Sequence, residues 1–189
     1  MVDASRTLLA LLAAGRSERF GPDDKLAADF LGRPLASHVA TALEAVPFLT
    51  RVAIVSSTGV AFPGYRRIEN PAPDTGLSGS VRLAAQGARD CGAAALLIAL
   101  ADMPRVTAAQ ILRLLDAAQT ADAVIASSDG TRPSPPALFA AGRFAELLAL
   151  EGDHGARALI QGGVHIVTSP QELIDIDTPE DLARLRALA

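Results

Sequence analysis

The chain has 189 residues, of which half are hydrophobic, 20% are charged and only 4% are aromatic. A net charge of −4 and an estimated isoelectric point of 5.3 argue against a general binder of nucleic acids or membrane surfaces. No apolar segment reaches the ~20 residues of a membrane span, and the residues before the first apolar run lack the pattern of a signal peptide. The single cysteine, Cys91, can form neither an internal disulfide nor a thiolate metal site. We therefore expect a soluble, cytoplasmic protein with an aliphatic core.

The first predicted element is an apolar strand that begins at Thr7 and ends in a short basic loop. The loop offers small residues and cations, namely Ala13, Ala14, Gly15, Arg19 and Lys25. A ligand can approach the main chain at the small residues, where backbone N–H groups and the cations can meet phosphate oxygens. The glycine spacing fits neither a Walker A loop nor the three-glycine dinucleotide fingerprint. The simpler alternative is a solvated loop without a ligand.

The chain then alternates between predicted helices and strands. We expect a helix over residues 35–46, strands over 51–56 and 66–69, and a helix over 79–88. The proline-rich segment between the last two is irregular, and four small polar or glycine residues flank it: Asn70, Gly76, Ser78 and Ser80. A helix N-terminus with hydroxyl side chains suits a ribose, a base edge or a phosphate, although Ser78 or Ser80 could simply cap the helix.

A third apolar strand, over residues 93–100, is followed directly by Asp102. A carboxylate at the carboxyl end of a buried strand is costly to hold there without a partner. Mg²⁺ is a natural partner, because it binds one or two carboxylates together with phosphate oxygens and water. Asp102 lies too far upstream to cap the next helix, a role that Thr107 fills better.

The next segment is predicted to contain a helix over 107–118, a strand over 121–126 and a proline-rich loop over 127–136. It continues with a helix over 144–150, a second helix that ends at residue 160, and a strand over 164–167. Within it, Arg132 either binds an acceptor phosphate or is solvated. Asp153 is expected to cap the helix that ends at residue 160. Arg157, one turn further on, either forms an ion pair with Asp153 or reaches an acceptor.

The tail combines two acidic residues with a helix cap. In an extended strand Ile174 and Ile176 face one way, so that Asp175 and Asp177 face the other. Two like charges on one face repel each other, and a divalent cation would relieve that repulsion. Thr178 is expected to cap the last helix.

Several of these segments resemble one family. The string Leu12-Ala13-Ala14-Gly15-x-Ser17-x-Arg19-Phe20-Gly21, followed by Lys25, resembles the signature loop of the MobA/MocA-like nucleotidyltransferases. In that family the loop holds the triphosphate of a nucleotide. Similar segments occur at residues 70–80, 102–104, 152–157 and 175–181. Two departures are visible: Lys25 lies slightly later than in the family, and Pro133-Ser134-Pro135 replaces its usual glycine.

The alternation of strands and helices predicts an α/β fold, a three-layer αβα sandwich with a Rossmann-like, mostly parallel sheet, and the resemblance adds the nucleotide-diphospho-sugar transferase type. We expect one nucleotidyltransferase domain over residues 1–189. By resemblance to the molybdenum cofactor cytidylyltransferases, the chain is expected to transfer a nucleoside monophosphate from an NTP, namely CTP, to the phosphate of the molybdopterin-bound molybdenum cofactor. Pyrophosphate is released, Mg²⁺ assists, and a client molybdoenzyme makes transient contact.

The resemblance also implies roles for individual residues. The nucleotide is expected to contact Leu12, Ala13, Ala14, Gly15, Ser17, Arg19, Lys25, Asn70, Gly76, Ser78 and Ser80. Catalysis is assigned to Arg19, Lys25 and Asp102, and the metal to Asp102 and Asp177. The acceptor is assigned to Arg132, Pro136, Asp153, Arg157 and Asp175. Two alternatives stay open: a nucleotidyltransferase acting on a sugar, alcohol or other small phosphate, and a non-catalytic carrier of the cofactor.

Overall fold

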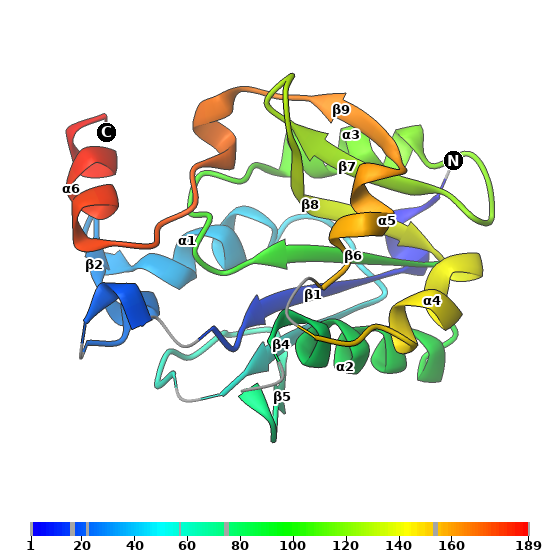
Figure 1. The fold of residues 1–189 in the computed structure, drawn as a ribbon, viewed down its shortest axis with the longest axis horizontal. Coiled ribbons are helices and arrows are strands. Elements are labelled where there is room, and N and C mark those ends of the chain that lie inside the picture. The colour runs from blue at the N-terminus through cyan, green and yellow to red at the C-terminus, as the bar shows by residue number, and fades with distance from the viewer. Residues whose placement is uncertain are drawn as a thin grey trace.

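The computed structural model describes residues 2–15, 18–21, 23–56, 58–73, 76–152 and 155–188. A seven-stranded sheet with the order β5-β4-β1-β6-β8-β7-β9 runs through the molecule (Figure 1). Its strands are β1 (Thr7–Ala13), β4 (Thr50–Val55), β5 (Arg66–Glu69), β6 (Ala95–Leu100), β7 (Val124–Ser128), β8 (Pro133–Ala140) and β9 (Val164–Val167). All neighbouring pairs are parallel except those that β8 makes with β6 and β7. The predicted mostly parallel α/β fold is confirmed.

Helices cover both faces of the sheet. They are α1 (Leu35–Ala42), α2 (Leu77–Asp90), α3 (Ala108–Ala117), α4 (Phe144–Leu148) and α5 (Arg157–Gln161). The last helix, α6 (Pro179–Ala187), lies apart from the sheet at one end of the molecule (Figure 1). Side chains alternate along β1, so that Leu9 and Leu11 face α1 and α3 whereas Leu8 and Leu12 face α2, α4 and α5. Because all of these strand positions are buried, the inner strands have the uninterrupted apolar sequence that marked them as strands.

The sheet has a switch point between β1 and β6. From β1 the chain adds β4 and β5 on one side, and then returns to add β6 on the other side. In open α/β sheets, ligands bind outside the carboxyl ends of the strands at such a point. Gly15 follows β1 and Asp102 follows β6, so both lie at this edge.

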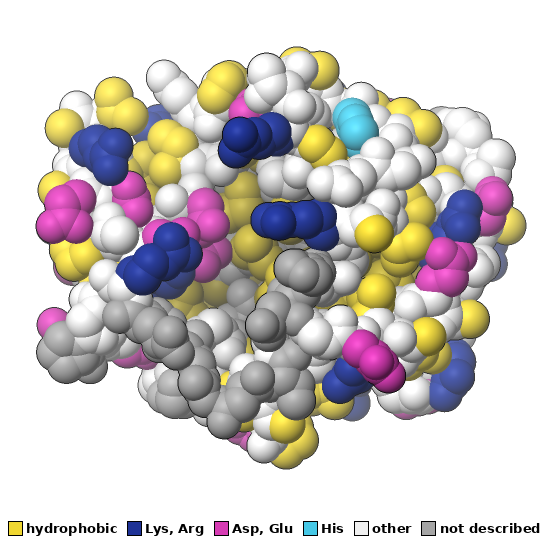
Figure 2. All heavy atoms as spheres, viewed as in Figure 1, with side chains coloured by type: hydrophobic (Ala, Val, Ile, Leu, Met, Phe, Trp, Pro, Cys, Tyr) yellow, Lys and Arg dark blue, Asp and Glu magenta, His cyan; other side chains and the backbone are white. Residues whose placement is uncertain are grey.

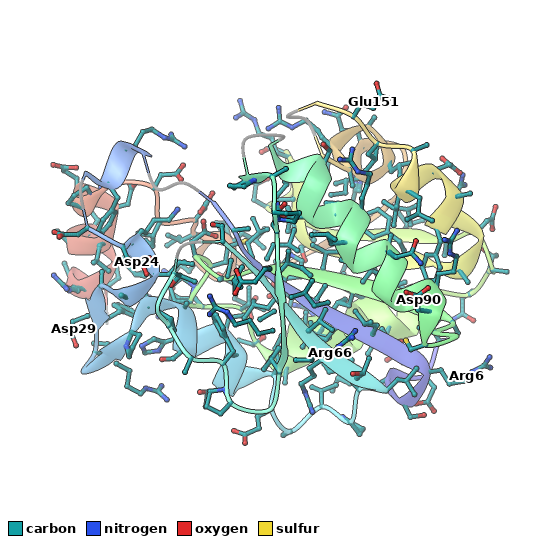
Figure 3. The ribbon with its side chains drawn as sticks, turned by 90° about the horizontal axis from the view of Figure 1, so that it is seen from below. Arg6, Asp24, Asp29, Arg66, Asp90 and Glu151 are labelled. Atoms are coloured by element: carbon teal, nitrogen blue, oxygen red, sulfur yellow. The ribbon has the colours of Figure 1, made fainter. Side chains whose placement is uncertain are left out.

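The tail packs against the segment that follows β1. A two-stranded hairpin, β2 (Asp29–Phe30) and β3 (Arg33–Pro34), lies beside α6 at one end of the molecule (Figures 1 and 3). Phe30 and Leu35 share a small apolar cluster with Ile176, Leu182 and Leu185. This cluster fixes the carboxyl-terminal segment next to the basic loop.

Two local predictions were wrong and one was confirmed. The tail around Ile176 is extended but pairs with no described strand, because a 3₁₀ turn over Pro170–Leu173 directs it away from the sheet edge. Residues 133–136, predicted as loop, begin β8. Thr178 does cap α6, accepting a hydrogen bond from the Asp181 N–H in a reciprocal capping box.

Within the part of the chain that the structure describes, no helix has both the length and the apolar character to cross a bilayer.

Candidate functional site

The end of β1 forms the floor of a cavity at the switch point. This cavity has a volume of about 260 Å³ and is lined by Ala14, Gly15, Gly76, Ser80 and Asp102, among others. Ala14 is buried, and no atom lies within 4 Å of where a Cβ on Gly15 would stand. The small residues after β1 therefore leave room beside the main chain, as their sequence predicts.

The N-terminus of α2 forms the opposite wall. Gly76 is its N-cap residue, with φ 71° and ψ −164°, a conformation that is essentially restricted to glycine. Ser80 lines the cavity, and its Oγ accepts a hydrogen bond of 3.1 Å from Asn70 Nδ2. Asn70 is itself buried and its Oδ1 accepts from the Ala72 N–H, so Asn70 orients Ser80 and the turn before the helix.

Three carboxylates meet beside this cavity. Asp102, Asp175 and Asp177 each offer an oxygen, and these oxygens lie within 4.8 Å of one another. The Ile176 N–H donates to the Asp102 carbonyl over 3.1 Å, which holds the tail across the end of β6. Asp102 Oδ1 is buried without a hydrogen-bond partner among the described residues. A buried, unpartnered carboxylate oxygen is costly, so this atom is available to a ligand.

Lys25 lies against the carboxylates. Its Nζ is 2.8 Å from Asp102 Oδ2 and 3.4 Å from Asp177 Oδ1, and its side chain is only 8% exposed. Asp24 caps the short turn that carries it, accepting from the Leu26 N–H, and lies at the same end of the molecule as the tail (Figure 3). Burial acts to lower the pKa of Lys25, but Asp102 and the neighbouring carboxylates outweigh burial and raise it. Lys25 is therefore a fixed cation.

Arg19 approaches the same group from the solvent side. Its Nη2 donates to Asp177 Oδ2 over 2.6 Å, while 71% of its side chain remains exposed. Basic and acidic side chains surround a hollow with an apolar floor on this face (Figure 2). Two cations and three carboxylates thus share one rim.

Asp175 has an unusual protonation equilibrium. Desolvation of its carboxyl group, followed by repulsion from Asp102 and Asp177, raises its pKa to about 7. The residue as a whole is exposed, so we attribute the shift to the carboxyl group facing the other acids.

A second, larger cavity adjoins the first. It has a volume of about 330 Å³ and is lined mainly by apolar side chains, among them Val81, Ile98, Pro133, Pro135 and Phe139. Its polar groups belong to Ser134, Arg157 and Asp175. Leu12, Leu77 and Leu100 border both cavities. The carboxylates lie where the two cavities meet, because Asp102 lines the first and Asp175 lines the second.

Comparison with known proteins identifies the family. The model of the MobA-like NTP transferase domain matches residues 9–169. The chain belongs to this family. Its members are nucleotidyltransferases, so the chain is a MobA-like enzyme with a nucleoside triphosphate as substrate.

Among curated relatives, the purine catabolism protein PucB of Bacillus subtilis is 31% identical over 93% of both chains. The phosphoenolpyruvate guanylyltransferase of Rubrobacter xylanophilus is 32% identical over 59% of this chain and 57% of its own. The chain is also similar to solved structures. The homologue of Mycobacterium tuberculosis Rv0371c from Mycobacterium sp. strain JC1 has a TM-score of 0.81 at 23% identity, covering 97% and 96% of the two chains.

A manganese complex of Rv0371c from Mycobacterium tuberculosis H37Rv has a TM-score of 0.76 at 20% identity over 97% and 99% of the chains. Molybdopterin-guanine dinucleotide biosynthesis protein A from Archaeoglobus fulgidus has a TM-score of 0.65 at 19% identity over 96% and 97%. At such identities these structures show the shared MobA-like fold.

The structure gathers many, but not all, of the residues that the MobA-like resemblance singled out. Leu12, Ala14, Gly15, Gly76, Ser80 and Asp102 line the first cavity, and Arg157 and Asp175 line the second. Ala13 faces the opposite side of the sheet, Ser78 is fully buried in α2, and Asn70 lies behind Ser80. Arg132 lies on an exposed turn and Pro136 behind the cavity wall, so neither lines the two cavities. Ser17 and Asp153 fall outside the described residues.

The sequence reasoning missed the apolar wall of the second cavity. Val81, Ile98 and Phe139 have the residue types and spacing of core positions. The sequence signals for this cavity were Arg157 and Asp175, which were assigned to the acceptor, and the run Pro133-Ser134-Pro135, which departs from the MobA-like pattern.

Proposed function

We propose that this enzyme transfers cytidine monophosphate from CTP to the phosphate of the molybdopterin-bound molybdenum cofactor and releases pyrophosphate, with Mg²⁺ at the acidic cluster. The observation that carries the proposal is the junction of the two cavities. One is bordered by the small residues after β1 and the N-terminus of α2, the other is mainly apolar, and the carboxylates lie between them. Two substrates that occupied these cavities would meet at the acids.

The proposed step needs no activated side-chain nucleophile. An oxygen of the acceptor phosphate attacks the α-phosphorus of CTP, a new P–O bond forms, and the bond to the β-phosphate breaks. The acceptor phosphate is already ionised near neutral pH, so this chain has to orient the two phosphates and offset their charge. Gly15 and the N-terminus of α2 border the space for the triphosphate. We assign Lys25 and Arg19 to the charge of the departing pyrophosphate.

The acidic cluster fits a divalent cation. Asp102, Asp175 and Asp177 supply hard oxygen ligands, and the unpartnered Asp102 Oδ1 is an atom that a cation would satisfy. A manganese complex of Rv0371c, a protein with the same fold, supports this assignment. When bound, the metal would neutralise phosphate charge that develops during transfer. Without it, Lys25 offsets part of the carboxylate charge.

Two lines support the choice of substrates. The forms Ala13-Ala14-Gly15 and Arg19-Phe20-Gly21 resemble the cytidylyl branch of the family more than the guanylyl branch. The molybdopterin acceptor is supported by the fold neighbour from Archaeoglobus fulgidus, which is named for molybdopterin-guanine dinucleotide biosynthesis, whereas the choice of CTP over GTP rests on the loop sequence alone. The second candidate acceptor is a small phosphorylated metabolite, favoured by the identity to a phosphoenolpyruvate guanylyltransferase.

The test is Asp102→Asn, assayed for pyrophosphate release with each NTP, Mg²⁺ and molybdenum cofactor or phosphoenolpyruvate as acceptor. Loss of a charged group that acts in the transition state is expected to reduce kcat by about 100-fold or more. Asp116→Asn, the same change on an exposed position of α3, is the matched control and should retain wild-type turnover. Wild-type turnover by the Asp102→Asn enzyme would contradict the proposed site. Transfer to phosphoenolpyruvate alone would favour the second candidate.

A further inference from the structure

The strand β8 contains an irregularity at its start. Along most of its length it pairs with β7 in one register, with Val124 opposite Phe139 and Ala126 opposite Ala137. The next pair is Ser127 opposite Ser134, so Pro135 and Pro136 have no partner on β7. Proline has no N–H to donate to a ladder, and inside sheets it occurs at bulges for that reason. The prolines therefore force a bulge in an interior strand.

The same prolines end the pairing of β8 with β6. The ladder between these strands runs from Ala95 opposite Ala140 to Ile98 opposite Ala137, and stops there. The last part of β6, which includes Leu100, has no partner on β8. The larger cavity lies at this opening, with Leu100 on one side and Pro133 and Pro135 on the other. The bulge thus forms one wall of the cavity.

Two buried polar side chains hold the bulge from the opposite face of the sheet. The Ser127 hydroxyl donates to the Pro136 carbonyl over 3.0 Å and accepts from Gln110 Nε2 over 2.9 Å. Gln110 belongs to α3, and both side chains are almost fully buried. Neither residue lines either cavity, so neither can touch a substrate there.

This arrangement is costly if packing is its only role. Gln110 Oε1 is buried without a partner among the described residues, and a buried amide with an unpartnered oxygen destabilises a core that apolar residues could fill. What Gln110 and Ser127 do provide is the Ser127 hydroxyl as a hydrogen-bond donor to the Pro136 carbonyl in the bulge. Bulges next to active sites commonly serve to direct side chains.

We propose that Gln110 and Ser127 are positioning residues for the acceptor. They hold the bulge of β8 so that Pro133, Ser134 and Pro135 form a fixed, largely apolar wall, and this wall selects acceptors whose phosphate is attached to a body less polar than a sugar. The inference rests on the proposed function, because it takes the larger cavity as the acceptor site.

The experiment measures steady-state kinetics of Ser127→Ala, Gln110→Met and the double variant, with CTP and either molybdenum cofactor or glucose 1-phosphate as acceptor. Each single change should raise the acceptor KM about tenfold, which is the size expected when one buried hydrogen bond that positions the cavity wall of Pro133, Ser134 and Pro135 is lost. The CTP KM and the kcat at saturating acceptor should stay within about twofold, since neither residue touches the reacting groups. The double variant should resemble the single variants, because both changes break one network.

The matched control is Thr7→Val. Thr7 is also fully buried and its hydroxyl donates to a backbone carbonyl, that of Asp3, over 2.9 Å. It lies at the amino end of β1 next to Arg6, at the opposite end of the sheet from Asp24 (Figure 3). This variant should lose similar thermal stability without any change in acceptor KM.

The possible outcomes distinguish a failure of the proposed function from a failure of the positioning role of Gln110 and Ser127. If the wild-type enzyme releases no pyrophosphate with CTP and molybdenum cofactor, the proposed function fails and the inference fails with it, whatever its activity with glucose 1-phosphate. If the wild type is active and both single variants keep its acceptor KM, the inference alone is refuted. An equal rise in CTP KM, or the same rise in the Thr7→Val control, would also refute it. If Ser127→Ala does not fold, the acceptor KM of Gln110→Met provides the test. This variant retains the Ser127 hydroxyl that donates to the Pro136 carbonyl and loses only the hydrogen bond from Gln110 to Ser127.

Discussion

Replacing Lys25 by methionine tests how strongly the acidic cluster depends on its buried cation. Methionine keeps most of the length and volume of the side chain but removes the charge. At an effective dielectric constant of about 20, unit charges at the distances that separate Nζ from Asp102 and Asp177 attract by roughly 5–6 kcal/mol each, and desolvation of the ammonium group cancels much of this.

The net effect follows from burial. Removing one partner of a buried ion pair costs about 3–5 kcal/mol. Asp102 and Asp177 keep 22% and 32% of their side-chain surface exposed, so water screens part of the repulsion that remains. We therefore expect a loss near the lower limit, about 3 kcal/mol, which lowers Tm by about 6–12 °C for a chain of this size.

The assay is thermal unfolding followed by circular dichroism, in buffer with a chelator and again with Mg²⁺ or Mn²⁺. The cation should restore more stability to the Lys25→Met protein than to the wild type, because it replaces the lost positive charge. Arg19→Met is the control. Arg19 contacts the same Asp177 over 2.6 Å, but its side chain is 71% exposed, and exposed pairs contribute only about 0–1 kcal/mol. Equal losses in the two variants, or a loss of less than about 2 °C for Lys25→Met, would refute the reasoning.

Two further predictions concern pH and the N-terminus of α2. The pKa of Asp175 is raised to about 7 in the folded protein, so folding favours the protonated carboxyl group. The free energy of unfolding, measured by urea titration in the presence of a chelator, should therefore decrease as the pH rises from about 4 to 7. In the Asp175→Asn variant this dependence on pH should be weaker. A slope of the opposite sign would show that another group dominates. Gly76→Ala should destabilise the fold by about 1–3 kcal/mol and raise the nucleotide KM, because alanine cannot readily adopt φ 71° and ψ −164°. Gly87→Ala, within the same helix and with only ordinary contacts for the new Cβ, should not destabilise it, and equal losses at both positions would contradict the backbone argument.

Much of the fold could be predicted from the sequence because its signals are local. Uninterrupted apolar runs predict β1 and β6, and the capping residues Thr107 and Thr178 predict the starts of α3 and α6. The antiparallel β8 could not be predicted in the same way. Its first residues are mostly prolines, which indicate a loop by composition, and only their pairing with the preceding strand β7 makes them part of a strand.

The candidate site was predictable to a similar degree. Lys25 and Asp102 lie far apart in the sequence, yet each follows a parallel strand, so the edge of the sheet brings them together. The strand assigned to the tail was wrong, but alternation about the buried Ile176 still places Asp175 and Asp177 beside Asp102. The apolar wall of the larger cavity carried little signal, because residues such as Ile98 and Phe139 have the same character whether they line a cavity or fill a core.

The position of Lys25 has a practical consequence for observing the enzyme at work. It is the only lysine in the sequence. Reductive methylation with ¹³C-formaldehyde would therefore place an NMR label on one side-chain amine, and its resonance can be told from that of the terminal amine by titration. That signal would report on the interior of the acidic cluster without any mutation, and its response to added nucleotide would test the proposed contact between the Lys25 ammonium group and the phosphates.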